Sequence, residues 1–553
     1  MIAVLADEAE HEVVREFFEL FKTPWDFFRS DLAHDVLICG GDEIPQTPAR
    51  LILAYGVGGR QDSPENGASP AQNFSNVVVC GGKHRIPIFG SCSVLRSGGV
   101  AIFWEEKSRQ PVARQETSGG RTIVRFGFDL FSEIRRLITE GQPVAHAALP
   151  TLDRHIQILR DLILYCSIPL VEIPPLPGGH PFIACLTHDV DHPRVRDHKW
   201  DHTMFGFLYR ATFGSLGKFC SGRLSLRDLA ANWLAAFSLP FVHLGLARDF
   251  WDEFDRYLEI EKDLTSTFFV IPKRNDPGRN GVGSAPLKRA SRYGASDIAR
   301  ELQRLRSQNR EVGLHGIDAW CDGKEARTEL QTIRHLIPKN EIGVRMHWLY
   351  FDEQSPALLD KAGFSYDSTV GYNETVGYRA GTSQAYKPLT AKRMLEVPLH
   401  VMDTALFYSD YMNLPTAEGA AAVAPFVENV SRSGGVLTIN WHDRSLAPER
   451  RWGGVYLELL KTLRKANAWF ATAIDTAQWF RKRRGAAIET VVRDGANLRI
   501  KVTIPDETDT LPGLVLRLHT PGQQQRDSFD QSDVIDRYLD MPVTRSGEFV
   551  FAV

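Results

Sequence analysis

Side chains that bind metals or exchange protons follow short apolar runs at five places along the chain. They are Asp189 with Asp191, His315, Arg345 with His347, Asp367, and His442. Short apolar runs of this kind are typical of buried strands. Carboxylates and imidazoles hold divalent cations and also act as general bases and acids. The pattern predicts metal-assisted chemistry in which one acid of the first pair binds a metal and the other acts as a base.

The first of these places is the most informative. The apolar run 182–186 follows a turn-rich segment, 174–180, and ends in Thr187-His-Asp-Val-Asp-His192. A lone Asp-x-Asp is more often a turn or a helix cap than a site. Two acids flanked by two histidines favour a site instead.

Each of the other residues also has a structural explanation. Asp367 is compatible with a turn, His442 with a buried histidine bonded in the core, and Arg345 with an ion pair to a helix. Five such residues in succession, each at the end of a strand, are hard to explain by packing alone. We therefore expect them to converge.

The elements that must position these residues alternate between strand and helix. Strands are predicted at 182–186, 265–272, 311–314, 343–350, 364–369, 394–399 and 436–440, and helices at 295–309, 325–336, 356–362, 455–465 and 473–481. Repeated strand-then-helix units predict a parallel sheet, and the carboxyl ends of its strands carry the chemistry. The fold class is α/β, with a distorted (β/α) barrel as the main domain.

Changes in the pattern of apolar and polar residues along the chain predict three domains. Residues 1–145 read as an N-terminal α/β domain, with a polar, glycine-rich loop at 60–72. Residues 146–485 form the barrel domain, with a helical insertion at about 193–262. Residues 486–553 alternate apolar and polar side chains between turn residues, which predicts a small antiparallel, sandwich-like β domain with His519 at its surface.

The insertion is unusually apolar for a connection between barrel elements. Residues 203–246 are rich in Phe and Leu, with scattered Arg and Lys. One interpretation is a set of helices packed on the barrel. The functional alternatives are a lid, a groove for a partner, or a patch that contacts a membrane surface.

Composition limits the function classes. The chain has 553 residues, 43% hydrophobic and 24% charged, which is ordinary for globular protein, and its net charge of −3 gives no general attraction for nucleic acid. Seven cysteines without a Cys-x-x-Cys pair favour reduced thiols. The N-terminus lacks the pattern of a signal peptide, and no apolar run is long enough to span a membrane. We expect a cytoplasmic protein, at most peripheral to the inner membrane.

The order of the strand-end motifs resembles the polysaccharide deacetylase family (carbohydrate esterase family four, the chitooligosaccharide deacetylase homology fold) over about 180–480. The matching segments are 186–191, 267–272, 313–315, 345–348, 366–369 and 437–442. More narrowly, the chain resembles the large deacetylase-like proteins encoded with bacterial capsule and surface-polysaccharide genes. Two positions depart from the family pattern: Ala319 stands where a second metal-binding His is usual, and His347 stands where Pro is usual.

The resemblance implies a role for each residue. Asp189 would be the catalytic base and His442 the general acid, with Arg345 and Asp367 holding the catalytic groups in register. Zn²⁺ or another divalent cation would be bound by Asp191 and His315. A catalytic metal needs about three protein ligands. His347 is the candidate for the third, and Asp318, His188 and His192 are the alternatives.

The function implied is metal-dependent removal of an N-acetyl group from a sugar or glycan during surface-polysaccharide synthesis. Hydrolysis of a non-sugar amide or cyclic imide on the same scaffold is a second hypothesis. A non-catalytic glycan-binding or assembly protein is a third, favoured by the missing second His and by the large flanking domains. The sequence leaves the sugar, the acyl group and the oligomeric state open.

Overall fold

The computed structural model describes residues 1–41, 43–58, 73–505, 508–521, 529 and 537–552. The chain divides into two compact units. One comprises Met1–Gly179, Ala380–Leu389 and Trp479–Val553, and the other His180–Arg379 and Thr390–Gln478. The loop predicted at 60–72 lies outside the described residues.

The first unit contains a mixed nine-stranded sheet, which confirms the predicted N-terminal α/β fold. Its strand order is β2-β1-β3-β4-β9-β8-β7-β5-β6, parallel from β2 to β9 and antiparallel beyond. The strands are β1 (Ile2–Leu5), β2 (Trp25–Phe27), β3 (Val36–Gly40), β4 (Leu51–Tyr55), β5 (Asn73–Gly81), β6 (His84–Ser93), β7 (Val100–Glu105), β8 (Pro111–Ser118) and β9 (Arg121–Phe126). Helices α1 (His11–Leu20), α2 (Leu130–Thr139) and α3 (Thr151–Tyr165) each bury one apolar face.

The domain limits differ from the prediction because distant segments pair with one another. The C-terminal strands are β20 (Ala487–Asp494), β21 (Asn497–Thr503), β22 (Leu514–Thr520), β23 (Arg537–Val543) and β24 (Gly547–Ala552). They are antiparallel, as predicted, but β22 pairs with β10 (Leu170–Glu172), so 170–172 and 514–520 form one sheet. Residues 146–179 and 486–553 therefore belong to the first unit. His519 is buried and bonded to Glu172 at 2.9 Å, so its predicted surface position is wrong.

The second unit is a distorted (β/α) barrel, as predicted. All strands of its sheet are parallel, in the order β16-β15-β14-β13-β12-β11-β18-β17, with β19 also paired to β11. The strands are β11 (Ile183–Val190), β12 (Thr267–Val270), β13 (Glu311–Gly316), β14 (Val344–Met346), β15 (Tyr366–Asp367), β16 (Leu395–Glu396), β17 (Val401–Met402), β18 (Val436–Asn440) and β19 (Trp469–Ala471). Five of these strands, β11, β13, β14, β15 and β18, carry the predicted chemistry at or near their ends.

The segment between β16 and β17 completes the ring of strands. The Val397 N–H donates to the Asp367 carbonyl at 2.8 Å, and the His400 N–H donates to the Thr438 carbonyl at 3.1 Å. The chain thus passes from the edge of β15 to the edge of β18 within four residues. This brings the ends of β15, β17 and β18 to the same side of the barrel.

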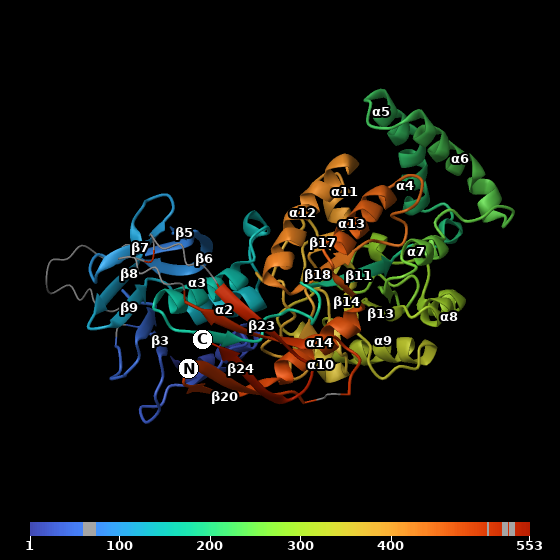
Figure 1. Ribbon diagram of the computed structural model, residues 1–553. Helices are drawn as coiled ribbons and strands as arrows, with labels where there is room; N and C mark the ends of the chain where they lie inside the picture. The colour runs from blue at the N-terminus through green and yellow to red at the C-terminus, as the bar shows by residue number, and fades with distance from the viewer. Residues whose placement is uncertain (42, 59–72, 506–507, 522–528, 530–536, 553) are drawn as a thin grey trace. The chain divides into compact units, whose positions relative to one another are not determined.

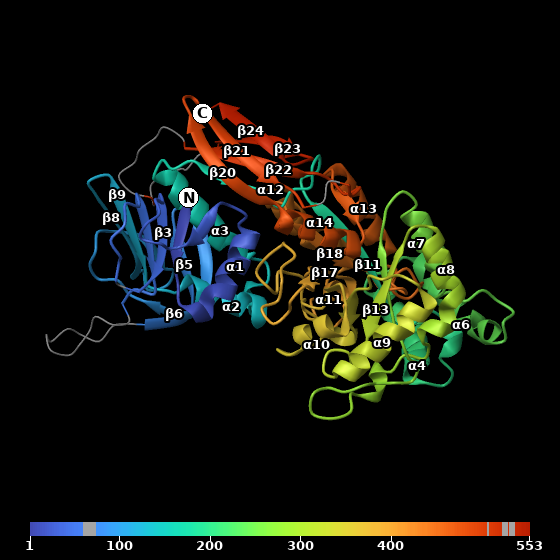
Figure 2. The same cartoon turned by 90° about the horizontal axis from the view of Figure 1, so that it is seen from below.

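Helices cover the outside of the barrel, as Figures 1 and 2 show. They are α7 (Phe254–Ile260), α8 (Ala299–Ser307), α9 (Gly323–Leu336), α10 (Ser355–Ala362), α11 (Asp403–Phe407), α12 (Thr416–Ser433) and α13 (Gly453–Lys465), followed by α14 (Ala473–Gly485), which runs into the first unit. The inner faces of α7 to α13 join the strands in one hydrophobic core. Burial of apolar side chains between the strands and the surrounding helices stabilises a barrel of this kind.

The predicted helical insertion contains α4 (His202–Tyr209), a π-helical turn (Arg210–Gly214), α5 (Ser215–Cys220) and α6 (Leu226–His243). Helices α5 and α6 extend beyond the helices that surround the barrel (Figure 1). Among the described residues, no helix combines the length and hydrophobicity that a membrane-spanning segment needs.

Gly343 provides a test of how the residue before β14 packs against Tyr366. A Cβ atom at this position would lie 2.0 Å from the Tyr366 ring. Gly343→Ala must displace that ring or the strand. We expect a loss of roughly 1–3 kcal/mol, typical of overpacking, and a lower thermal midpoint. Gly454→Ala is the matched control, because Gly454 lies in α13 with open space around its Cα atom. Equal midpoints for the two variants would contradict this packing.

Candidate active site

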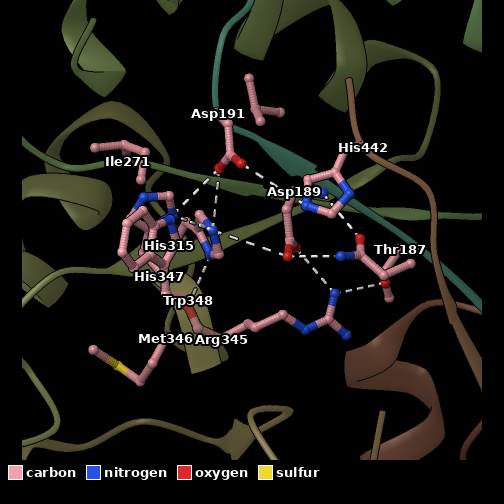
Figure 3. Close-up of polar contacts among 12 residues, drawn as sticks. Thr187, Asp189, Asp191, Ile271, His315, Arg345, Met346, His347, Trp348 and His442 are labelled. Carbon is pink, nitrogen blue, oxygen red and sulfur yellow. Dashed lines mark hydrogen bonds and ion pairs between the residues drawn. The ribbon is translucent and has the colours of Figure 1, made fainter. Parts of the chain in front are cut away.

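The strand ends bring six of the predicted residues together, as Figure 3 shows: Asp189, Asp191, His315, Arg345, His347 and His442. In the parallel register, His315 of β13 pairs with Arg345 of β14, and Thr187 of β11 pairs with Asn440 of β18. Residues one or two positions beyond these pairs leave the sheet at the same edge. His347 and His442 occupy such positions, and Asp191 directly follows the last residue of β11.

Asp191, His315 and His347 offer three ligand atoms that all lie within 4.8 Å of one another. His315 Nε2 lies 3.1 Å from His347 Nδ1. Asp191 Oδ1 lies 3.4 Å from the first of these nitrogens and 3.3 Å from the second. Among the described residues, this buried Oδ1 atom has no hydrogen-bond partner.

The second nitrogen of each imidazole fixes its tautomer. His315 Nδ1 lies 3.0 Å from the Arg345 carbonyl, and His347 Nε2 lies 3.0 Å from the Arg289 carbonyl. A carbonyl only accepts, so both of these nitrogens carry the hydrogen. In the neutral rings, two lone pairs therefore face each other beside a carboxylate. Burial lowers the pKa of His347, which favours its neutral form.

This arrangement fits a divalent cation. A tetrahedral ion with ligand distances of about 2.0–2.1 Å needs ligand atoms about 3.3–3.4 Å apart, close to the separations found here. Metal-binding histidines commonly donate the other N–H to a backbone carbonyl, as both do in this site. The donor set of two imidazoles and one carboxylate is typical of a catalytic zinc site with open positions.

The other candidates for the third ligand lie elsewhere. His188 is bonded to Glu261 at 2.9 Å, His192 contacts His198 at 3.1 Å, and Asp318 accepts from the Arg279 N–H at 2.8 Å. Ala319, at the position of the family's usual second His, is buried in the barrel core. Of the candidates that the sequence left open, the structure places His347 beside Asp191 and His315.

Asp189 is a buried carboxylate held on both oxygens. Arg345 Nη1 donates to Oδ1 at 3.0 Å, and Asn440 Nδ2 donates to Oδ2 at 2.7 Å. Burial would raise the pKa of Asp189, but the Arg345 charge lowers it below its ordinary value. Asp189 Oδ2 lies 3.9 Å from His315 Nε2, so an ionised acid adjoins the three-ligand group.

Arg345, which donates to Asp189, is itself held by Ser368 rather than by Asp367. Its Nε donates to the Ser368 carbonyl at 2.9 Å and its Nη2 to the Ser368 hydroxyl at 2.8 Å. Asp367 instead accepts from the Thr369 hydroxyl at 2.5 Å, and burial raises the pKa of Asp367 to about 6. Ser368, the neighbour of the predicted residue, therefore orients the guanidinium. The difference arises because successive residues of a strand point to opposite faces.

His442 has a partner that the sequence did not reveal. Asp403, at the start of α11, lies 2.6 Å from His442 Nδ1 and also accepts from the His442 backbone N–H at 2.7 Å. Burial alone would lower the pKa of His442, but the Asp403 carboxylate raises it to about 10. His442 Nε2, 3.8 Å from Asp191 Oδ2, is then a proton donor facing the site.

Asp403 follows β17, which has only two residues. A strand this short gives no periodic signal in the sequence, so its acid could not be assigned to a strand end. Asn440 lies within the motif that led to His442, but an amide alone does not indicate catalysis. Its role becomes visible only through its contact with Asp189.

The site opens into a cleft of about 470 Å³. Trp348, Tyr350, Tyr408 and Tyr411 line it together with the catalytic side chains, whereas Trp320, Tyr372 and Trp441 are buried elsewhere. Trp348 and Leu349 both have positive φ, 64° and 54°, which is unfavourable for such side chains. The hydrogen bond from Arg289 to the His347 carbonyl, 3.0 Å, holds the turn that presents Trp348 to the cleft.

No family model and no curated protein matches the chain. Among solved structures, the chain matches a protein described as a polysaccharide deacetylase from Mycobacterium smegmatis, at 16% identity and TM-score 0.34, over 58% of this chain and 99% of that one. The chain is similar to polysaccharide deacetylases.

Two further structures show the range of these similarities. An allantoinase matches at 12% identity and TM-score 0.36, over 55% of this chain and 92% of the other. A polysaccharide deacetylase described as involved in O-antigen biosynthesis, from Bordetella bronchiseptica, matches at 12% identity and TM-score 0.21, over 54% and 88%.

The three-ligand group predicts which histidines the metal requires. His315→Ala and His347→Ala should each remove bound zinc, whereas wild-type protein should hold about one ion per chain. Inductively coupled plasma mass spectrometry on purified, zinc-equilibrated protein measures this. His335→Ala is the control, since this exposed histidine bonds only within its own helix, at 2.7 Å from the Gln331 carbonyl. Zinc retained in His347→Ala would exclude His347 as a ligand.

Proposed function

We propose that this protein is a metal-dependent hydrolase that removes the N-acyl group, most simply acetyl, from an amino sugar in bacterial surface-polysaccharide synthesis. The observation that carries the proposal is the placement of Asp189 and His442. Each adjoins the group Asp191, His315 and His347, and each is held by partners of its own. A fixed carboxylate and a fixed imidazolium beside one metal group suit amide hydrolysis.

The residues divide the reaction between them. A divalent cation bound to Asp191, His315 and His347 would polarise the acyl carbonyl and activate a water. Asp189 accepts the proton of the attacking water, while Arg345 and Asn440 keep its carboxylate ionised and oriented. His442, kept protonated by Asp403, donates a proton to the departing amine nitrogen. The products are a carboxylic acid and a free amino sugar.

The cleft favours a sugar over a small imide. A volume of about 470 Å³ exceeds what a small cyclic imide fills, and it suits one or more sugar rings. Trp348, Tyr350, Tyr408 and Tyr411 offer aromatic faces on which sugar rings stack. The non-catalytic hypothesis gives no reason for Asp189 and His442 each to be buried with charged partners. Surface-polysaccharide synthesis and a cytoplasmic location remain part of the proposal.

Asp189→Asn tests the catalytic base. The amide keeps the shape of the side chain but accepts no proton, so turnover should fall by roughly 10²–10⁴-fold. Acetate release from N-acetylated hexosamine oligosaccharides measures activity, and zinc content shows that the metal group is intact. Asp263→Asn, at an exposed position, should act as wild type. Unchanged turnover in Asp189→Asn would refute this mechanism and favour the non-catalytic alternative.

Asp403→Asn tests the partner of the general acid. Without the carboxylate, His442 loses the charge that raises its pKa, and less of it is protonated near neutral pH. Turnover should fall by up to roughly 10²-fold, while zinc content stays at the wild-type level. Asp403→Glu should recover part of the loss because it restores the charge. Full activity in Asp403→Asn would show that His442 does not depend on Asp403.

A further inference from the structure

Residues 202–246, which we call the arm, expose far more apolar surface than a folded chain normally leaves in water. The exposed large apolar residues are Phe205, Tyr209, Phe213, Leu216, Phe219, Leu226, Trp233, Leu234, Phe237, Phe241, Leu244 and Leu246. Phe213 is 74% exposed and Phe237 is 72% exposed. Exposed apolar side chains concentrated in one stretch of the chain indicate an interaction site.

Helix α6 is apolar on two faces, and only one of them is covered. Ala235, Leu239 and Val242 pack into a cluster with Met204, Phe207 and Trp251. Leu226, Leu234, Phe237 and Phe241 recur at helical spacing along the other face and lie exposed. Because the inner face already secures the helix, the outer face is free for another surface.

The charge of the arm indicates which surface it contacts. The arm contains four basic residues, Arg210, Lys218, Arg223 and Arg227, and one acid, Asp228, although the whole chain has a net charge of −3. Asp228 forms an ion pair with Arg451, so the exposed charge of the arm is positive. Aromatic and aliphatic side chains combined with Arg and Lys are typical of helices that lie in the interface of an anionic membrane.

The arm is continuous with the catalytic cleft. His202, Thr203 and Arg210 line the cleft, while Phe205, Tyr209 and Phe213 of the same stretch are exposed. Arg444 also lines the cleft, and its buried Nη1 atom has no hydrogen-bond partner among the described residues. Arginines placed in this way suit a phosphate group.

We propose that the arm docks on the surface of an anionic lipid bilayer, and that the cleft takes its substrate from that surface. Resting on the function proposed above, the substrate is an N-acylated sugar carried on a membrane lipid through phosphate. Arg210 and Arg444 bind the phosphate, and the exposed side chains of α4 to α6 insert at the level of the lipid headgroups.

Co-sedimentation with vesicles tests the docking without any assay of activity. Wild-type protein should bind vesicles of equal parts phosphatidylglycerol and phosphatidylcholine, and bind pure phosphatidylcholine more weakly. Phe237→Ser/Phe241→Ser should bind at least about tenfold more weakly, because two large apolar contacts are lost. Val282→Ser/Val492→Ser, which changes two exposed apolar residues outside the arm, should bind as wild type.

Three outcomes would overturn the docking proposal. The first is wild-type protein that does not sediment with the anionic vesicles. The second is an equal loss of vesicle binding in both double variants. A self-associated wild type that Phe237→Ser/Phe241→Ser converts to monomer, without vesicle binding, would assign the arm to a second copy of the chain. Sedimentation velocity distinguishes this last case.

Deacetylation of two forms of one sugar tests the lipid-linked substrate separately from the deacetylase function. An N-acetylhexosamine linked through diphosphate to a polyprenol in anionic vesicles is compared with the same sugar on a nucleoside diphosphate. Phe237→Ser/Phe241→Ser should lower deacetylation of the lipid-linked form at least about tenfold and leave the soluble form unchanged. Equal rates in wild type and variant on the lipid-linked form would refute the substrate proposal. Vesicle binding by a wild type inactive on both forms would instead refute the deacetylase function.

Discussion

Two backbone carbonyls determine what the centre of this protein can hold. The Arg345 carbonyl fixes the hydrogen of His315 on Nδ1, and the Arg289 carbonyl fixes the hydrogen of His347 on Nε2. Both inward nitrogens are therefore lone-pair donors, 3.1 Å apart and beside the Asp191 carboxylate. Without a proton or a cation between them, these groups would repel one another. The rest of the site is arranged around that requirement.

The barrel supplies the arrangement through its register. Five neighbouring strands of the sheet are parallel, in the order β14, β13, β12, β11 and β18. Their carboxyl ends therefore meet at one edge. The base and the acid are then fixed by separate networks, Asp189 by Arg345 and Asn440, and His442 by Asp403. Each charged group is buried with an opposite charge or a polar partner, which is the condition under which buried charge is tolerated. This separation allows one acid to stay ionised while the imidazole nearby stays protonated.

The sequence was sufficient to predict the barrel and most of the side chains that meet at its strand ends. The strands that end in Asp189, His315, Arg345 and His442 are apolar runs with a clear break, so their existence and direction could be predicted. Asp403 was missed because its strand has two residues, and Ser368 was missed because Asp367 beside it carries the charge. The domain limits failed for another reason. The pairing of 170–172 with 514–520 joins segments more than 300 residues apart, and local patterns contain no trace of such a contact.

The arm adds to the barrel an exposed apolar surface that the proposed membrane docking requires. Its inner face packs in a hydrophobic cluster, its outer face exposes apolar side chains, and His202, Thr203 and Arg210 at its start line the cleft. The most direct test of the central claim is X-ray absorption spectroscopy at the zinc edge of the zinc-loaded protein. A first shell of nitrogen and oxygen that includes two imidazole rings is the predicted result. A shell of oxygen ligands without imidazole scattering, or no bound zinc, would contradict the site described here.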